Sequence, residues 1–213
     1  TMGGIIIIIA IIIPTLLLAR LDNVYIILML ITTLLMGALG FLDDYIKVFK
    51  KRKEGLHGRY KIIGQIAVGT IVATVLFLSP QAAIRENSET YMDGHVTEVN
   101  FADKETKSTK TTIPFVKNNN FDYADILPFK GEAKQVAGWI LFIIVSILIV
   151  TFISNSVNLT DGLDGLAAGC SAPGGMGLLI MAYVSSHIEL SSYLNIMFIP
   201  SSEELVIFAA AFV

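Results

Sequence analysis

Residues 136–153, VAGWILFIIVSILIVTFI, decide the fold class of this chain. The run carries no charge and approaches the length of about 20 mainly apolar residues that a helix needs to cross a bilayer. It does not alternate between polar and apolar residues, so a β-barrel strand is not indicated. We expect a helix, because the bilayer interior offers no partners for unpaired backbone groups.

Similar apolar runs occur on both sides of this stretch. Residues 3–18, 24–42 and 62–78 precede it, residues 166–184 follow it, and a further run begins at residue 204. Only 15% of the chain is charged, against about 25% in soluble domains, and 54% is hydrophobic, with a mean hydropathy of +0.70. The sequence therefore predicts an all-α polytopic membrane protein with about five to six transmembrane helices in one membrane domain.

The chain ends and the single cysteine indicate whether the chain is a fragment and whether it contains disulfides. Thr1 stands directly before an apolar run, and residues 205–213 form an apolar run that stops abruptly. We therefore expect an internal fragment, truncated at both ends, of a longer membrane protein. Cys170 alone excludes an internal disulfide framework, and the net charge of −3 gives no indication of nucleic-acid binding.

Basic residues set the expected orientation in the membrane. Residues 43–61 form a predicted basic loop, with seven Lys or Arg between residues 47 and 61. Such a density beside two spans marks the cytoplasmic side. Residues 79–135 lie one span away and form a predicted extracytoplasmic insert. Within it, residues 91–101 alternate around Asp93-Gly94, which predicts a small β-hairpin without chemistry.

The first polar cluster is the carboxylate pair Asp43 and Asp44, at the end of the span 24–42. Ionisable residues at membrane spans are expensive and usually functional. Neighbours on a helix point about 100° apart, so one carboxylate could bind a metal ion while the other accepts a proton. A solvated helix end neutralised by nearby lysines explains the pair equally well.

The second polar cluster is NSVNLTDGLDG at residues 155–165, a predicted cytoplasmic substrate-site loop. Asn155, Asn158 and Asp161 recur every three residues, which places them on one helix face. Gly162 allows the backbone to turn or to approach a ligand closely. Amides and carboxylates suit a base and a ribose, and carboxylates also suit Mg²⁺. Capping by Asn and Asp is the simpler explanation, but the cluster has more polar residues than a cap needs.

Three segments resemble those of the polyprenyl-phosphate N-acetylhexosamine-1-phosphate transferases. They are TMGG at residues 1–4, GFLDDYIK at residues 40–47 and NLTDGLDGLA at residues 158–167. The resemblance covers the motif order and span pattern of the whole chain, except residues 79–135. It implies a Mg²⁺-dependent phosphoglycosyl transferase, and the TMGG segment favours the branch whose donor is UDP-N-acetylmuramoyl-pentapeptide (UDP-MurNAc-pentapeptide).

In that branch, undecaprenyl phosphate attacks the β-phosphate of the donor, lipid I forms for peptidoglycan synthesis, and UMP leaves. The resemblance implies a multi-pass protein of the bacterial inner (cytoplasmic) membrane with its active site on the cytoplasmic face. It makes Asp43 the base or activator of the lipid phosphate, with Asp44 beside it as a catalytic residue and metal ligand. The substrate-binding residues that it implies are Thr1, Lys47, Asn155, Asn158, Asp161, Gly162, Leu163 and Asp164.

Other interpretations stay open at this point. The resemblance places the main Mg²⁺ ligand beyond residue 213, so the fragment alone is expected to be inactive. A sister transferase that uses UDP-N-acetylglucosamine shares both polar clusters. A membrane transporter is an alternative of another class, because intramembrane carboxylates also mark ion paths. The sequence leaves undecided the pentapeptide composition, the role of residues 79–135, a direct or covalent mechanism, and whether the parent forms a homodimer.

Overall fold

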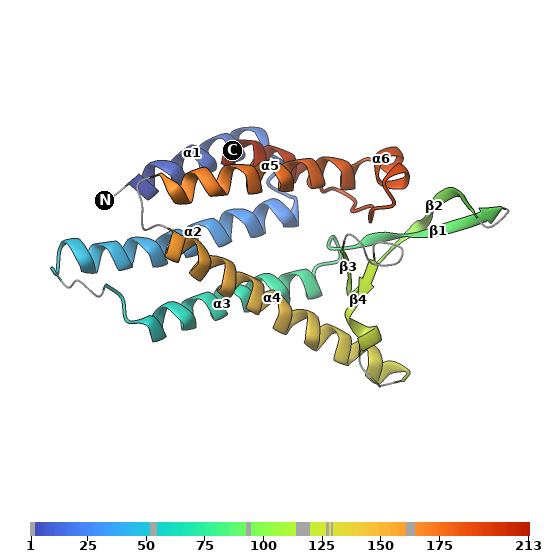
Figure 1. The fold of residues 1–213 in the computed structure, drawn as a ribbon, viewed down its shortest axis with the longest axis horizontal. Coiled ribbons are helices and arrows are strands. Elements are labelled where there is room, and N and C mark those ends of the chain that lie inside the picture. Colours follow the sequence, from blue (N-terminus) through green and yellow to red (C-terminus); the bar gives the residue numbers. More distant parts are fainter. Residues whose placement is uncertain are drawn as a thin grey trace.

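The computed structural model describes most of the chain, namely residues 3–51, 55–92, 95–113, 120–126, 128, 130–160 and 165–213. Long helices run side by side along the longest axis, and a small β insert projects from one end of them (Figure 1). The helices are α1 (Gly3–Leu18), α2 (Val24–Val48), α3 (Gly58–Leu78), α4 (Glu132–Thr160), α5 (Leu166–Ser186), α6 (Ile188–Tyr193) and α7 (Glu204–Phe212).

Four of these helices, α2 to α5, are long and apolar enough to cross a membrane by length and composition. The apolar helix α1 has 16 residues, and α7 has 9. The predicted class, an all-α polytopic membrane protein, is confirmed. The described residues contain four helices of spanning length rather than five to six, since α1 and α7 are shorter.

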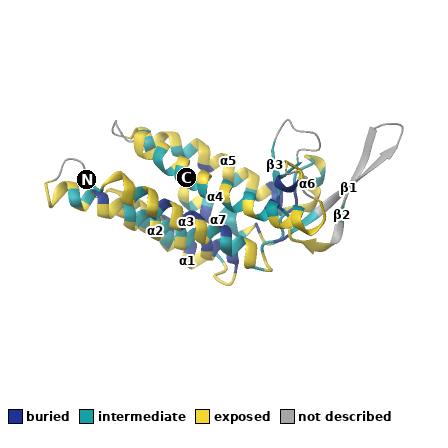
Figure 2. Cartoon of the chain, turned by 90° about the horizontal axis from the view of Figure 1, so that it is seen from below, coloured by how far each residue is buried: buried dark blue, intermediate teal, exposed yellow. Residues whose placement is uncertain are grey.

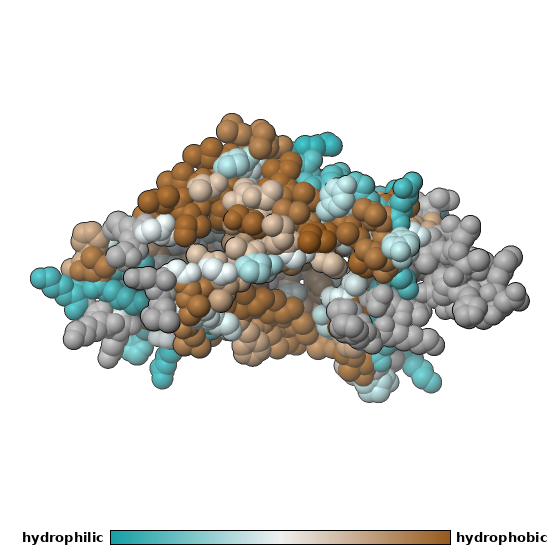
Figure 3. Space-filling model, turned by 45° about the horizontal axis from the view of Figure 1, so that its top comes forward, coloured by the Kyte–Doolittle hydropathy of each residue, from teal (hydrophilic) through white to brown (hydrophobic). Residues whose placement is uncertain are grey.

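The surface of the helices has the character expected of a protein that faces lipid. Large apolar side chains such as Leu17 and Leu178 are 77% and 70% exposed, and exposed residues line the outer faces of the helices (Figure 2). Hydrophobic side chains cover the middle of the visible face, whereas hydrophilic ones gather toward its two ends (Figure 3). The buried core is small and lies at Ile11, Ile26 and Phe208, where α1, α2 and α7 meet.

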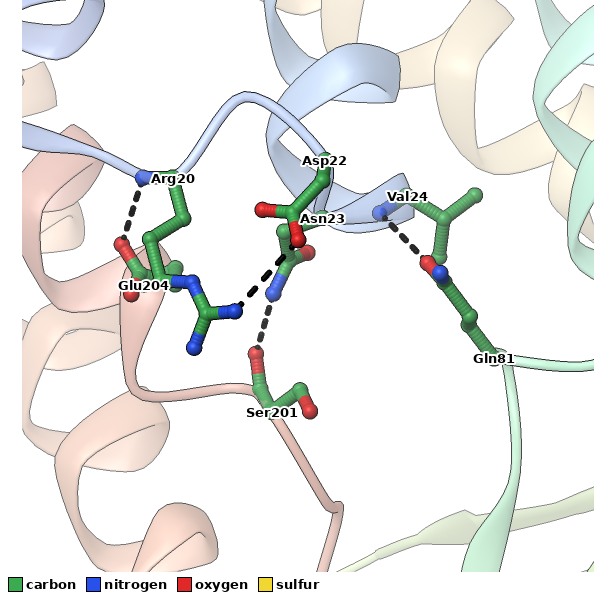
Figure 4. Close-up of polar contacts among 7 residues, drawn as sticks. All are labelled: Arg20, Asp22, Asn23, Val24, Gln81, Ser201 and Glu204. Carbon is green, nitrogen blue, oxygen red and sulfur yellow. Dashed lines mark hydrogen bonds and ion pairs between the residues drawn. The ribbon is translucent and has the colours of Figure 1, made fainter.

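A polar network joins the α1–α2 turn to two distant segments (Figure 4). Asn23 caps α2, because its side chain accepts hydrogen bonds from the first turn, and its Nδ2 donates to the Ser201 carbonyl at 2.7 Å. The Val24 N–H donates to Oε1 of Gln81 at 3.0 Å. The Val24 N–H at the start of α2 is thereby satisfied by a side chain that follows α3, and the capping side chain of Asn23 is held by the segment before α7.

The insert begins with a two-stranded antiparallel sheet of β1 (Ile84–Met92) and β2 (His95–Thr106). Met92 pairs with His95 and Ile84 with Thr106, so the predicted hairpin is confirmed and is longer than residues 91–101. Asp93-Gly94 lies outside the described residues. The sequence did not predict the second pair, β3 (Lys110–Thr112) with β4 (Asn120–Asp122), or the 3₁₀ turn η2 (Tyr123–Ile126).

Aromatic contacts fix this insert to the ends of α3 and α4. The Trp139 ring of α4 lies 5.0 Å from Phe77 of α3 and 5.5 Å from Phe142, measured between ring centroids. Phe142 in turn lies 6.1 Å from Tyr123 of η2. Edge-on pairs at these separations add to the burial of apolar area. The insert is thus anchored at the end of the helices opposite to the end of α2 that carries Asp43 and Asp44 (Figure 1).

Candidate functional site

The carboxylate pair lies on the last turns of α2, because this helix continues to Val48. The helix α3 begins at Gly58, so the predicted basic loop 43–61 is shorter than expected, and only residues 49–57 separate the two helices. Lys47 follows Asp43 by four residues and Asp44 by three, and side chains at these spacings are neighbours on a helix surface.

Asp43 is the most highly connected carboxylate of the site. Its Oδ2 lies 2.6 Å from Nζ of Lys47 and 2.9 Å from Nζ of Lys61. Its Oδ1 accepts a hydrogen bond of 2.7 Å from the Leu56 N–H. The side chain is only 7% exposed. Three donors therefore hold Asp43 as an anion, and it ties α2 to the α2–α3 loop and to α3.

Asp44 has a different environment from its neighbour. Its side chain is 50% exposed, and its Oδ1 lies 4.0 Å from Nζ of Lys47. This difference agrees with the expectation that adjacent residues of a helix point in different directions. One carboxylate of the pair therefore organises cations, and the other faces the open space at the end of α2.

A glycine allows the α2–α3 loop to lie against Asp43. Gly55 adopts a φ of +66°, a conformation that glycine tolerates and L side chains rarely adopt. A Cβ atom there would overlap Oδ1 of Asp43 and lie 2.6 Å from Cε of Lys47. The close approach brings the Leu56 N–H within reach of Asp43, so Gly55 is part of what builds the carboxylate site.

The amide residues come from α4, which continues to Thr160. Asn155 and Asn158 therefore lie on a helix, and the predicted loop 155–165 is shorter than expected. Nδ2 of Asn155 donates to Oε1 of Gln65 and to the Thr151 carbonyl, each at 2.8 Å. Nε2 of Gln65 donates to Oγ of Ser154 at 3.0 Å. A partly buried polar network thus links α3 to α4.

Both groups of polar residues open into one cleft of about 760 Å³ between the helices. A second hollow of about 430 Å³ between α1 and α2 shares Asp43, Asp44 and Asn158 with it. Glycines and small side chains of α1, α2 and α5 form other parts of the cleft wall. Its polar lining from α2, α3 and α4 comprises Asp43, Asp44, Lys61, Gln65, Ser154, Asn155 and Asn158.

The structure brings together five of the residues that the sequence singled out, although they come from α2 and α4. These five are Asp43, Asp44, Lys47, Asn155 and Asn158. The other five predicted site residues lie outside the described residues: Thr1, Asp161, Gly162, Leu163 and Asp164. Sequence reasoning did not include Lys61 among the site residues and missed Gln65, whose sole local signal is a polar side chain in an apolar run.

The site partly fits the divalent cation that the resemblance implies. In the described part of the chain, no group of three or more His, Cys, Asp or Glu residues is arranged to hold a metal ion. Mg²⁺, however, commonly takes one or two carboxylates together with substrate phosphates and water. The half-exposed carboxylate of Asp44 suits such a site, whereas both oxygens of Asp43 already have partners.

Known proteins give a consistent comparison. The model of glycosyl transferase family 4 matches residues 26–209. Over all 213 residues, the chain is 70% identical to a phospho-N-acetylmuramoyl-pentapeptide-transferase of Porphyromonas gingivalis. It is 62% identical to the protein of that name from Parabacteroides distasonis and 61% identical to the one from Bacteroides thetaiotaomicron.

These matches cover all of this chain but 51%, 51% and 50% of the three relatives, respectively. The chain therefore spans about half the length of the curated relatives that it matches. The family match includes most of α2, all of α3 to α6, most of α7, the carboxylate pair and both asparagines. This chain belongs to glycosyl transferase family 4.

Proposed function

We propose that the protein containing this chain transfers phospho-N-acetylmuramoyl-pentapeptide from UDP to undecaprenyl phosphate. The products are lipid I, a precursor of peptidoglycan, and UMP. The observation that carries the proposal is the 70% identity to a transferase of that name over all 213 residues, which include the cleft with its paired carboxylates. The proposed location is the bacterial inner membrane, with this cleft on the cytoplasmic face.

Both proposed substrates are phosphate anions, so their mutual repulsion is the main obstacle to reaction. The cleft offers the ammonium group of Lys61 and the adjoining hollow offers that of Lys47, and both contact Oδ2 of Asp43. Cations directed at transferring phosphoryl groups stabilise the charge of such a transition state. A phosphate of either substrate would compete with Asp43 for these lysines, so the site exchanges an internal ion pair for contacts to substrate.

This exchange defines what Asp43 does in the reaction. A carboxylate whose oxygens accept three N–H donors has little tendency to take a proton. Asp43 becomes a better acceptor for the proton of the lipid phosphate once Lys47 or Lys61 turns to a substrate phosphate. An oxygen of the lipid phosphate then attacks the β-phosphorus of the donor, the bond from that phosphorus to the UMP oxygen breaks, and UMP leaves.

Asp44 and Asn158 have positions that suit direct contact with the donor. Both line the cleft, and Asp44 is half exposed. We assign Asp44 as a ligand of Mg²⁺, which when bound would neutralise charge on the donor diphosphate. Asn158 offers amide hydrogen bonds to the nucleoside or sugar. Thr1, Asp161, Gly162, Leu163 and Asp164 complete the proposed donor site on the strength of the family resemblance.

The test is UMP release by the full-length parent in detergent with undecaprenyl phosphate, with and without Mg²⁺. UDP-MurNAc-pentapeptide and UDP-N-acetylglucosamine are offered in parallel reactions. We expect Mg²⁺-dependent release from the first donor alone. Release from UDP-N-acetylglucosamine would overturn the proposed donor in favour of a sister transferase. No release from either donor by folded protein would overturn the proposed reaction and favour transport.

A further inference from the structure

Gln65 is a polar side chain buried within an apolar helix. It is 5% exposed and lies on α3, a helix long and apolar enough to cross a membrane. A buried amide without partners is strongly unfavourable in such surroundings. Gln65 uses its Nε2 to donate to Ser154 and its Oε1 to accept from Asn155. Both partners lie on α4, so this side chain fixes how α4 sits against α3.

Gln65 also lies one helical turn after Lys61, on the same helix. Residues four apart occupy the same side of a helix, and both side chains line the cleft. Lys61 contacts Asp43 of α2 at 2.9 Å, whereas Gln65 contacts Asn155 of α4 at 2.8 Å. A single turn of α3 therefore joins the carboxylate half of the cleft to the amide half.

The contacts of Asn155 show how the hydrogen bond from Gln65 affects the position of α4. Nδ2 of Asn155 divides its two hydrogens between Gln65 and the Thr151 carbonyl. The amide group of Asn155 is thus held by contacts to both α3 and α4. Asn158, about one turn later on α4, lines the cleft together with Asp43 and Asp44. A loss of the Gln65 contact would let this end of α4 shift relative to α2.

We propose that Gln65 is a positioning residue, which acts through Asn155 to set the distance between the amide residues of α4 and the carboxylate pair of α2. This inference rests on the proposed function for its catalytic consequence. Gln65 does not touch the reacting atoms. It holds together two halves of a cleft, each of which keeps its own substrate contacts when Gln65 is changed.

The first experiment compares Gln65→Met with the wild-type full-length parent. Methionine keeps most of the volume and removes both hydrogen bonds. Misplacement of reacting groups by about 1 Å can lower a rate by up to about 100-fold, so we expect kcat to fall by roughly 10-fold or more. The KM of each substrate is expected to stay within about threefold, because the contacts that bind substrate equally in the ground state and the transition state are preserved.

A control with the same substitution removes a side-chain hydrogen bond of an exposed glutamine at the other end of the protein. Gln81 accepts from the Val24 N–H there, so Gln81→Met should lower the Tm without changing kcat.

A double-mutant cycle provides a second control. It compares Gln65→Met, Asn155→Leu and the variant that carries both substitutions. If Gln65 acts through Asn155, the double variant should lose no more kcat than Asn155→Leu alone. Additive losses would overturn the proposal.

A distance measurement separates this inference from the proposed function. Spin labels are placed at Val48, near the end of α2, and at Leu159, which is 82% exposed near the end of α4. Gln65→Met should broaden or shift the distance distribution, and Gln81→Met should leave it unchanged. An unchanged distribution in Gln65→Met overturns the inference. If the distribution shifts but wild-type protein releases no UMP, the proposed function fails while the positioning of α4 by Gln65 stands.

Discussion

Lys61 of α3 reaches Asp43 of α2 across the helix interface, with 2.9 Å between Nζ and Oδ2. Lys47 contacts the same oxygen from one turn further along α2, at 2.6 Å. One nearly buried carboxylate therefore keeps two ammonium groups close together at the rim of the cleft. Two cations held in this way need little further reorganisation to receive a diphosphate, and such preorganisation is a large part of electrostatic catalysis.

The first prediction concerns the carboxylate at the centre of this arrangement. Asp43→Asn should abolish UMP release and also destabilise the fold, because it leaves two lysines without their shared counter-ion. Removal of one partner from a buried ion pair costs about 3 kcal/mol or more. The measurements are thermal unfolding in detergent and UMP release. Near-normal turnover in Asp43→Asn would show that the assigned role of Asp43 is wrong.

Asp125→Asn is the matched control for this substitution. Asp125 forms an ion pair of 2.6 Å with Lys134, but its side chain is 70% exposed. Exposed pairs contribute little to stability, so this variant should keep both its Tm and its turnover. A loss of Tm as large as that of Asp43→Asn would mean that the burial of Asp43 is not the reason for the effect.

The second prediction distinguishes Lys61 from the other basic residues near the α2–α3 connection. Lys61→Met should lower kcat/KM for UMP release by on the order of 100-fold, as does the loss of one donor to a developing anion. Lys50→Met is a suitable control, because Lys50 does not line the cleft and should lose less than about threefold. Equal losses in the two variants would indicate that only the overall charge of this region matters.

The third prediction concerns the packing that holds α3 against α4. A Cβ atom at Gly69 would lie 2.9 Å from Cα of Ile147, which is a backbone atom and has little room to move. Gly69→Val should therefore destabilise the protein by about 3 kcal/mol, as overpacking does at a rigid contact. Gly177 of α5 has no atom within 4 Å of such a Cβ, so Gly177→Ala should leave the Tm unchanged or raise it. Thermal unfolding of both variants tests whether the close α3–α4 contact is required.

The long helices and the β1–β2 hairpin could be predicted from local patterns alone, whereas the short helix α6 was not predicted. The apolar run of residues 3–18 coincides with α1, and the turn signal at Asp93-Gly94 predicted the β1–β2 pairing. Helix ends were less predictable, since polar residues such as Asp43 and Asn155 continue α2 and α4 beyond their apolar parts. Hydropathy locates the part of a helix that prefers lipid, and it does not locate the last hydrogen-bonded turn.

The partners of the site residues depend on contacts that no local pattern encodes. The sequence indicated that Asp43 matters, but it gave no means of pairing this carboxylate with Lys61, 18 residues later, or with the N–H of Leu56. The role of Gln65 depends likewise on α4, whose Asn155 lies 90 residues away. Both relationships arise when α3 packs between its neighbours, which is a tertiary event.

The last prediction concerns the β1–β2 hairpin. Asn87 and Phe101 are paired across the two strands, so residues 88–100 can be replaced by Asn-Gly, which favours a two-residue hairpin turn. The shortened protein keeps Phe101, whose ring lies 5.7 Å from that of Phe198. The hairpin projects from the end of the helices that lies away from the carboxylate pair (Figure 1). We therefore expect kcat for UMP release to stay within about twofold. The Tm should also change little, because a shorter surface loop changes the folding free energy only slightly.

Trp139→Ala provides the contrast for the shortened hairpin, because it removes the ring between Phe77 and Phe142. It should lower stability by about 2 kcal/mol, less than for a fully buried tryptophan, and the Tm should fall accordingly. If instead the shortened protein loses more than about 10-fold in kcat at an unchanged Tm, the hairpin takes part in turnover. Two routes connect the hairpin to the rest of the protein: the helices α3 and α4, which flank the insert in the chain, and Phe198, whose ring contacts Phe101 of β2. Unchanged kcat in the shortened protein would confine the chemistry to the far end of the helices.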